Sequence, residues 1–321
     1  MSPARGVHSA ARVQGVTKPT VPGNGLSPPR WVQELLGPPI RRKVASSSGP
    51  AITIVRSSRW ALATAVISEV TRLDALNLQR RTVEAHEGLR RALNESDAPH
   101  PLRVWNFIPD IHSRLTEEFD RYMAFNAGRF AAFCDWFGGS EAFDQEVPTA
   151  TGIGHDSPDL VIHVLGGAEP GLHLHNPRQR RPYRYSRRFG PFPPCFARAT
   201  VVSVDPGDVR LVLVGGTASV LDESSVHLNN MNAQLDETFH NLCRLLDTAS
   251  RAARAPSPPK DAGGLLACFR TMRVYYVRPE DEARLRAAVA RRVPHLTDVE
   301  FLRAELCRSE LLVEIEGTAV V

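Results

Sequence analysis

The C-terminal segment of the sequence places two carboxyl groups on one face of a predicted strand. Alternate side chains of an extended strand point to opposite sides, so Glu314 and Glu316 share a face within Leu311–Gly317. A glutamate whose pKa is raised by burial and by a second carboxylate can act as a general acid near neutral pH. A strand on the protein surface would show the same alternation, so the pattern alone leaves both interpretations open.

A second candidate for chemistry is an arginine-rich segment. Six arginines lie within Arg178–Arg188, interleaved with Tyr183 and Tyr185. Guanidinium groups that contact phosphates and aromatic rings that stack on bases would suit a nucleic-acid groove. The same residue types suit a small polycarboxylate, because arginine binds a carboxylate through two parallel hydrogen bonds. A solvated loop is the third interpretation, and composition does not choose among the three.

Motifs of several other catalytic classes are missing from the sequence. It contains no G-x-S-x-G, no G-x-x-x-x-G-K-S/T and no H-E-x-x-H motif. Gly152-Ile153-Gly154 lacks the third glycine of a dinucleotide loop. His173 and His175 have no third metal ligand at a recognisable spacing. We therefore expect neither a metal nor a cofactor.

Composition narrows the class of protein further. The 321 residues are 42% hydrophobic and 23% charged, which fits about two compact domains. Five cysteines without a C-x-x-C spacing indicate reduced thiols. No apolar run approaches the ~18 residues of a membrane span, so we expect a cytoplasmic protein. The net charge of +4 is only weak evidence for a nucleic-acid partner.

Hydrophobic periodicity predicts the elements that must position these residues. A leader over residues 1–49, rich in Pro, Gly and Ser, is predicted to be poorly ordered apart from a short helical turn at Trp31–Leu36. Strands and helices then follow in the order ββαβαββ. They are strands Ala51–Arg56 and Trp60–Ser68, helix Asn77–Asn94, strand Pro101–Pro109, helix His112–Phe137, and strands Val147–Gly152 and Asp159–Gly166.

The same order of elements is predicted a second time. It comprises strands Phe196–Val204 and Val209–Gly215, helix Asn229–Ala249, strand Cys268–Arg278, helix Glu280–Arg292, and strands Val299–Cys307 and Glu310–Val320. Leu160–Val164 matches Leu311–Ile315, which aligns His163 with Glu314. We therefore predict a tandem duplication of an α+β unit. The aligned position holds a histidine in one copy and a glutamate in the other, as expected if one copy kept its active site and the other lost it.

The repeat predicts the organisation of the chain. An N-terminal unit covers residues 50–167, a linker covers 168–195, and a C-terminal unit that carries the active site covers 196–321. The linker contains the arginine-rich segment and is too long for a minimal connector. Because long ordered loops in compact proteins tend to be functional, we expect this linker to contribute to the site.

The C-terminal unit resembles the reactive-intermediate deaminase (Rid/YjgF) fold, whose final strand carries the same V-E-I-E pattern. The whole of Pro50–Val321 resembles the chorismatase family, whose members are similar to two such chorismate-mutase-like units in tandem. The segments that carry this resemblance, in the family's order, are Arg103–Pro109, Ala124–Arg129, Asn176–Gln179, Tyr183–Tyr185, Phe196–Thr200, Gly216–Ser219 and Leu311–Gly317.

The resemblance implies a cofactor-free enzyme that acts on chorismate and releases pyruvate. Chorismate is a dicarboxylate whose enolpyruvyl ether becomes labile when its methylene carbon is protonated. Glu314 is the expected acid. Buried carboxylates need cationic partners. By resemblance, the expected substrate-binding residues are Arg129, Tyr183, Arg184, Arg198 and Thr217.

Gly215 and Cys307 resemble the product-determining residues of the branch that forms 3-hydroxybenzoate, although Cys307 could equally be a small buried hydrophobe. We therefore expect 3-hydroxybenzoate, for use in secondary metabolism. One rival reaction is hydrolysis to 3,4-dihydroxycyclohexa-1,5-dienoate and pyruvate. A rival of another class is a Rid-like module that binds RNA or a small ligand. The expected partner is chorismate alone, without nucleic acid or membrane, and the expected assembly is a monomer or a homotrimer.

Overall fold

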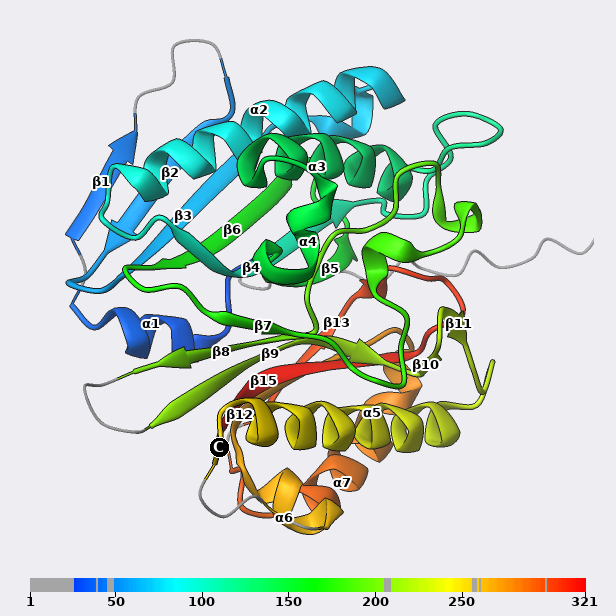
Figure 1. Cartoon of the computed structure of the whole chain (residues 1–321). Helices are drawn as coiled ribbons and strands as arrows, with labels where there is room; N and C mark the ends of the chain where they lie inside the picture. The colour runs from blue at the N-terminus through cyan, green and yellow to red at the C-terminus, as the bar shows by residue number, and fades with distance from the viewer. Residues whose placement is uncertain are drawn as a thin grey trace, which may run out of the picture.

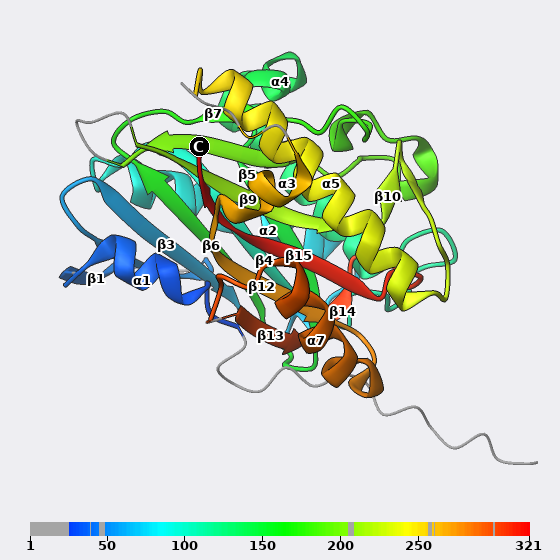
Figure 2. The ribbon, with the colours of Figure 1, turned by 90° about the horizontal axis from the view of Figure 1, so that it is seen from below.

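Two β-sheets lie face to face, and helices cover their outer faces (Figure 1, Figure 2). The computed structural model describes residues 26–38, 40–44, 49–204, 209–255, 259, 261–297 and 299–321. In Figure 1, α2 (Ala75–Asn94) and α3 (Arg121–Phe137) cover the upper sheet, and α5 (Met231–Ala252) and α7 (Glu282–Arg292) cover the lower one. None of the described helices combines the length and hydropathy that a membrane span requires.

The first sheet has the strand order β1-β2-β3-β6-β4-β5-β14. Its only parallel pair among the described strands is β4 with β5, and its other neighbours are antiparallel. The strands are β1 (Ile40–Val44), β2 (Ala51–Arg56), β3 (Trp60–Ile67), β4 (His100–Pro109), β5 (Thr149–His155), β6 (Leu160–Gly167) and β14 (Glu305–Leu306). A short helix, α4 (Phe143–Glu146), precedes β5.

The second sheet has the strand order β13-β12-β15-β9-β8-β7. Within the described residues β12 and β13 form its one parallel pair. The strands are β7 (Leu172–Leu174), β8 (Ala199–Ser203), β9 (Arg210–Ala218), β12 (Phe269–Tyr276), β13 (Val299–Arg303) and β15 (Val313–Val320). A hairpin of β10 (Val220–Leu221) and β11 (Ser224–Ser225) follows β9, and α6 (Ala262–Ala267) follows α5.

The two sheets repeat one topology. The first contains the order β2-β3-β6-β4-β5, and the second contains the matching order β8-β9-β15-β12-β13. The register also repeats, because His163 of β6 faces Trp105 of β4 and Glu314 of β15 faces Tyr275 of β12. The predicted α+β fold of two tandem ββαβαββ units is confirmed.

The second helix of the first unit is shorter than predicted. The sequence predicted a helix from His112, whereas α3 begins at Arg121. Asp120 is the N-cap, and its side chain accepts a hydrogen bond from the backbone N–H of Met123 at 2.8 Å. Asp110 adopts a left-handed backbone conformation with φ of 45°. The chain between these two aspartates is therefore mostly a loop, and it lies beside the pocket described below.

The predicted strand Val299–Cys307 is wrong in one respect, because the structure divides it between the two sheets. β13 belongs to the second sheet, whereas β14 pairs with β5 of the first sheet. The chain crosses at Ala304, which is fully buried and donates its N–H to Tyr276 O at 3.0 Å. This crossing brings Cys307 into the space between the sheets.

Part of the predicted leader packs on the fold. Helix α1 (Arg30–Leu36) forms where the short helical turn was predicted, and β1 pairs with β2. Trp31, Val32 and Leu36 are buried in the apolar layer between the sheets. Residues 26–38 and 40–44 of the predicted leader therefore contain a short helix with a buried apolar face and a strand. Residues 1–25, 39 and 45–48 lie outside the described residues.

Candidate active site

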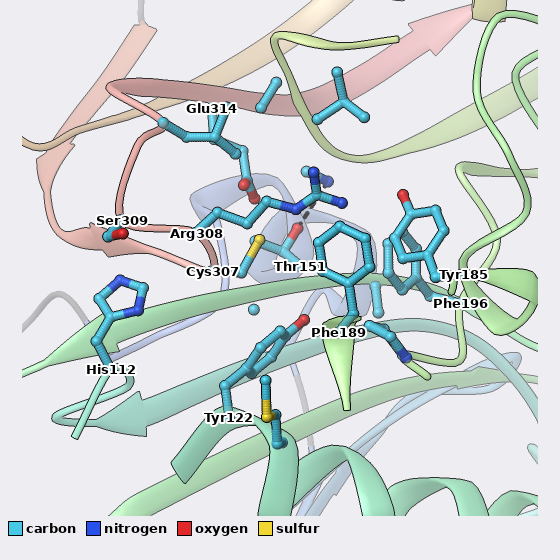
Figure 3. A pocket seen from close by; sticks show the side chains of 18 of the residues that line it. His112, Tyr122, Thr151, Tyr185, Phe189, Phe196, Cys307, Arg308, Ser309 and Glu314 are labelled. Atoms are coloured by element: carbon cyan, nitrogen blue, oxygen red, sulfur yellow. Dashed lines mark hydrogen bonds between the residues drawn. The ribbon is translucent and has the colours of Figure 1, made fainter. Parts of the chain in front are cut away.

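A pocket lies between the two sheets and is lined by both units and by the linker (Figure 3). In Figure 3 the side chains of Glu314, Cys307 and Tyr122 point toward the middle of this pocket. The lining includes Tyr122, Arg129 and Thr151 of the first unit, Tyr185, Arg188 and Phe189 of the linker, and Arg198, Gly216, Cys307, Arg308, Glu310 and Glu314 of the second unit.

Glu314 is a buried carboxyl group on the wall of this pocket. Its side chain is only 4% exposed, and its carboxyl group makes no hydrogen bond to another residue in the described parts of the chain. Burial raises the pKa of Glu314 to about 8, the Glu316 carboxylate adds to the rise, and nearby arginines oppose it. The group is therefore mostly protonated at neutral pH, as a general acid must be.

Glu316, on the same face of β15, is fully hydrogen-bonded instead. Its carboxylate accepts hydrogen bonds from Arg103 Nη2 at 2.5 Å and Thr151 Oγ1 at 2.5 Å. It also accepts from Trp105 Nε1 at 3.2 Å and from the Tyr275 hydroxyl at 2.9 Å. Three of these donors belong to the first unit, so the buried ion pair with Arg103 joins the two sheets. The carboxylate of Glu316 is therefore fixed by hydrogen bonds within the protein, whereas the carboxyl group of Glu314 faces the pocket.

Gly216 of β9 leaves the space that the carboxyl group of Glu314 occupies. A Cβ atom at Gly216 would overlap Glu314 Oε1. Gly215, expected to be product-determining, lies on the other side of the strand. A Cβ atom there would lie 2.7 Å from Thr149 Cγ2 and 3.1 Å from Ala150 O. The structure therefore brings Gly216, and not Gly215, against the expected acid.

Three arginines of the pocket wall have no carboxylate partner among the described residues. They are Arg129, Arg198 and Arg308. Arg129 Nη2 donates to Asn126 Oδ1 at 2.8 Å, and Arg198 Nη2 donates to the Tyr185 hydroxyl at 2.6 Å. The buried Nε of each of these two arginines has no hydrogen-bond partner in the described part of the chain. Because an uncompensated buried charge is costly, the pocket is suited to an anion.

Arg308 is a pocket residue that the sequence analysis missed. Its guanidinium group stacks 4.2 Å from the ring centre of Phe189 and 5.3 Å from that of Tyr185. Its Nη1 donates to Glu223 O at 2.9 Å and to Ser225 Oγ at 3.1 Å. It therefore ties the linker and the β10–β11 hairpin to the C-terminal segment. Its position directly after Cys307 was the one signal in the sequence that could have found it.

The structure does not place Tyr183 and Arg184 in the pocket lining. The Tyr183 hydroxyl donates to Asp144, and Arg184 Nη2 donates to Asp144 Oδ2 at 3.1 Å. The side chain of Arg184 is 62% exposed. Because Pro182 begins a 3₁₀ turn in the linker, the tyrosine that lines the pocket is Tyr185, two residues further on.

Thr217 and Cys307 have different surroundings. Thr217 is buried in β9, and its hydroxyl donates to Gly215 O at 3.0 Å, so it does not line the pocket. Cys307 does line it. Burial raises the pKa of the Cys307 thiol to about 12. The thiol is therefore neutral, and it contributes size and shape to the pocket.

Between the two ββαβαββ units, the pocket brings a buried, protonated carboxyl group together with arginines that have no carboxylate partner among the described residues. This arrangement is suited to acid catalysis on a small anion. The family described as "Chorismatase FkbO/Hyg5-like, N-terminal" matches residues 40–166 of this chain. A 3-hydroxybenzoate synthase of Streptomyces hygroscopicus is 34% identical over 244 residues, which are 74% of this chain and 69% of that protein. The chain therefore belongs to the chorismatase family of enzymes, as the sequence predicted.

Two further comparisons agree with this assignment. A chorismatase of Streptomyces rapamycinicus is 28% identical over 243 residues, which are 74% of this chain and 69% of that protein. The crystal structure of a chorismatase superimposes with a TM-score of 0.74 at 23% identity, over 88% of this chain and 80% of the other. At that identity the superposition supports the fold.

Proposed function

We propose that this protein converts chorismate to 3-hydroxybenzoate and pyruvate by acid catalysis. The observation that carries the proposal is Glu314, a buried carboxyl group with a pKa of about 8. It faces a pocket whose arginines Arg129, Arg198 and Arg308 have no carboxylate partner among the described residues. The name of the 34% identical relative, 3-hydroxybenzoate synthase, supports the product. The two products together contain all the atoms of chorismate, so the reaction consumes neither water nor a cofactor.

Glu314 would protonate the methylene carbon of the enolpyruvyl ether. The proton leaves a carboxyl oxygen, the electron pair of the C=C bond forms the new C–H bond, and positive charge develops on the neighbouring carbon and the ether oxygen. The weakened ether is then cleaved by an internal route that aromatises the ring. The proton that the ring loses restores the carboxyl group. Positioned proton transfer of this kind typically contributes about 10²–10⁴-fold to a rate.

The arginines would bind the two carboxylates of the substrate. Arg129, Arg198 and Arg308 are the cations of the pocket without a carboxylate partner among the described residues, and the Tyr185 hydroxyl lies beside Arg198. A bound dianion would compensate the guanidinium charges that lower the pKa of Glu314. Substrate binding would therefore keep the acid protonated.

One incubation distinguishes this proposal from its two rivals. Purified protein with chorismate should yield pyruvate and a new aromatic acid, identified by mass and ultraviolet spectrum. Pyruvate with a non-aromatic diene acid, one water heavier than 3-hydroxybenzoate, would support hydrolysis. No turnover with salt-sensitive retention of RNA would support an RNA-binding module. Arg178 and Arg181 of the arginine-rich segment are already paired with Glu237 and Asp144, which disfavours that last reading.

The rate should fall as the pH rises through about 8. The protonated form of Glu314 is the active one, and the pKa of this group is raised to about 8. We therefore expect kcat/KM to be level below that pH and to fall about tenfold per pH unit above it. The measurement is pyruvate release at low chorismate concentration across the range. A rate that increases from neutral to alkaline pH would contradict the assignment of the acid.

The ring product should depend on Gly216 and Cys307. Both residues border Glu314, so the combined Gly216→Ala and Cys307→Val substitutions change the shape of the pocket at the acid. We expect the share of 3-hydroxybenzoate to fall and that of the diene acid to rise, as measured by chromatography of the products. Cys268→Val, which lies outside the pocket lining, is the matched control and should leave the ratio unchanged. An unaltered ratio in the double variant would refute this role.

A further inference from the structure

The duplicated fold contains a counterpart of the Glu314 pocket. His163 of β6 occupies the register position that Glu314 occupies in β15. Arg103 of β4 lies two residues before Trp105, which faces His163, and Arg273 of β12 lies two residues before Tyr275, which faces Glu314. The two arginines therefore occupy equivalent positions. We call the space in front of His163 and Arg273 the second inter-sheet site.

Residues of the N-terminal segment occupy the second inter-sheet site. His163 Nε2 lies 2.8 Å from Leu26 O, and Arg273 Nη1 donates to Ser27 O at 2.9 Å. Because a carbonyl oxygen can only accept, His163 carries a proton on Nε2. Its Nδ1 then accepts from Thr64 Oγ1 at 2.8 Å. Two consecutive backbone carbonyls therefore satisfy one donor from each unit.

Helix α1 closes the same site with apolar side chains. Trp31 is 7% exposed and Val32 is 1% exposed, and the ring of Trp31 lies 5.8 Å from that of Trp105. The backbone N–H of Arg30 donates to Glu300 Oε1 at 3.2 Å, and the other oxygen of that carboxylate accepts from Arg273. In Figure 1, α1 lies at the end of the inter-sheet space away from β10, whose Val220 lines the pocket.

We propose that Leu26–Leu36 is a built-in ligand of the second inter-sheet site, and that this site accepts an aryl carboxylate when the segment leaves. The vacated site would present the Nε2–H of His163 and the Nη1 of Arg273 to the two oxygens of one carboxylate. Trp105 and Phe107 belong to the same apolar layer and would contact the aryl ring. The proposal does not depend on the chemistry of Glu314.

The test measures whether diethyl pyrocarbonate reaches His163 in the full chain. Neutral imidazole reacts with this reagent when it is accessible, and burial lowers the pKa of His163 to about 4, so it is neutral throughout. We expect His163 to be inert in the wild type and to react at least about tenfold faster in the Trp31→Ala, Val32→Ala variant, because that variant loses the buried anchor of α1. Peptide mass mapping identifies the modified histidine.

Two controls separate release of the segment from loss of the fold. Gln33→Ala with Glu34→Ala changes exposed residues of the same helix and should leave His163 inert. His86, buried between α2 and the aromatic side chains of α3, should stay unmodified in every variant. A reactive His163 in the wild type, or an inert one in the Trp31→Ala, Val32→Ala variant, would overturn the assignment of the segment as occupant.

Benzoate tests the chemical class of the ligand. Added to the Trp31→Ala, Val32→Ala variant, it should slow the modification of His163 at least about threefold by occupying both donors. The readout is specific to His163, so binding of benzoate in the Glu314 pocket does not contribute to it. If benzoate leaves the rate at His163 unchanged, the site does not take aryl carboxylates.

Discussion

Replacing Glu314 by glutamine should lower chorismate turnover by about 10²–10⁴-fold. Glutamine keeps the size and polarity of the side chain, but it has no proton to give to the enol ether. The surrounding contacts change little, because the carboxyl group makes no hydrogen bond to another described residue and lies in the space that a Cβ atom at Gly216 would fill. Steady-state kinetics should show a loss in kcat, with KM for chorismate nearly unaltered.

The matched control for this substitution is Glu310→Gln. Glu310 also lines the pocket, but it is exposed and its carboxylate accepts a hydrogen bond from Ser225 Oγ at 2.8 Å. Its variant should retain activity within a few-fold of the wild type. If the Glu314→Gln enzyme kept more than about a tenth of its rate, another group would have to supply the proton.

Thermal unfolding of the Glu314→Gln variant shows whether its inactivity has a structural origin. The pKa of Glu314 is about 8 in the folded chain against an ordinary value of 4.5, so the wild type loses stability as the pH rises from about 4.5 to about 8. At about 1.4 kcal/mol per pH unit, the rise from pH 4.5 to pH 7 costs somewhat more than about 3 kcal/mol. The glutamine variant escapes this loss, and its Tm at pH 8 should equal or exceed that of the wild type.

Replacing Arg103 by methionine should lower the free energy of unfolding by about 3–5 kcal/mol. The guanidinium group of Arg103 and the carboxylate of Glu316 are each 1% exposed, and they lie 2.5 Å apart across the two sheets. Methionine fills a similar space but leaves a buried carboxylate without its counter-ion. Urea denaturation, followed by tryptophan fluorescence, measures the change, and the midpoint should fall.

A double variant tests whether the unpaired charge causes that loss. Arg103→Met with Glu316→Gln contains neither charge. The amide oxygen can still accept from Trp105 and Tyr275, and the amide NH2 can donate to Thr151 Oγ1. We expect it to recover most of the stability that the single variant loses. Equal midpoints for the single and the double variant would show that the unpaired carboxylate does not cause the loss.

The sequence predicts the repeated fold well because the evidence for it is local. Alternating and helical periods mark each strand and helix, and the match of Leu160–Val164 with Leu311–Ile315 places His163 and Glu314 at equivalent positions. The same alternation predicts that Glu314 and Glu316 share a face. It does not show that one carboxyl group is paired and the other free, because Arg103 lies more than two hundred residues away.

The sequence-based predictions of site residues are wrong where tertiary structure decides which way a side chain faces. The pairing of β15 with β9 changes register between Ile315 and Gly317, and this irregularity makes Gly216, not Gly215, the neighbour of the acid. The linker has no hydrophobic periodicity, so its composition does not show which tyrosine faces the pocket. The turn at Pro182–Arg184 directs Tyr185, and not Tyr183, into the lining. The burial of α1 depends on an opening between the sheets that no local pattern reveals.

The crossing strand β14 affects how genes of this kind can recombine. Glu305 and Leu306 come from the second copy, yet they pair with Gly154 and Ile153 at the margin of the first sheet. In a chimera that took only one copy from a distant homologue, β14 would have to pair with a β5 strand from the other parent. The partners of the buried ion pair, Arg103 and Glu316, would also come from different parents. Viable crossovers should therefore carry both halves of the duplication together, as one inherited block.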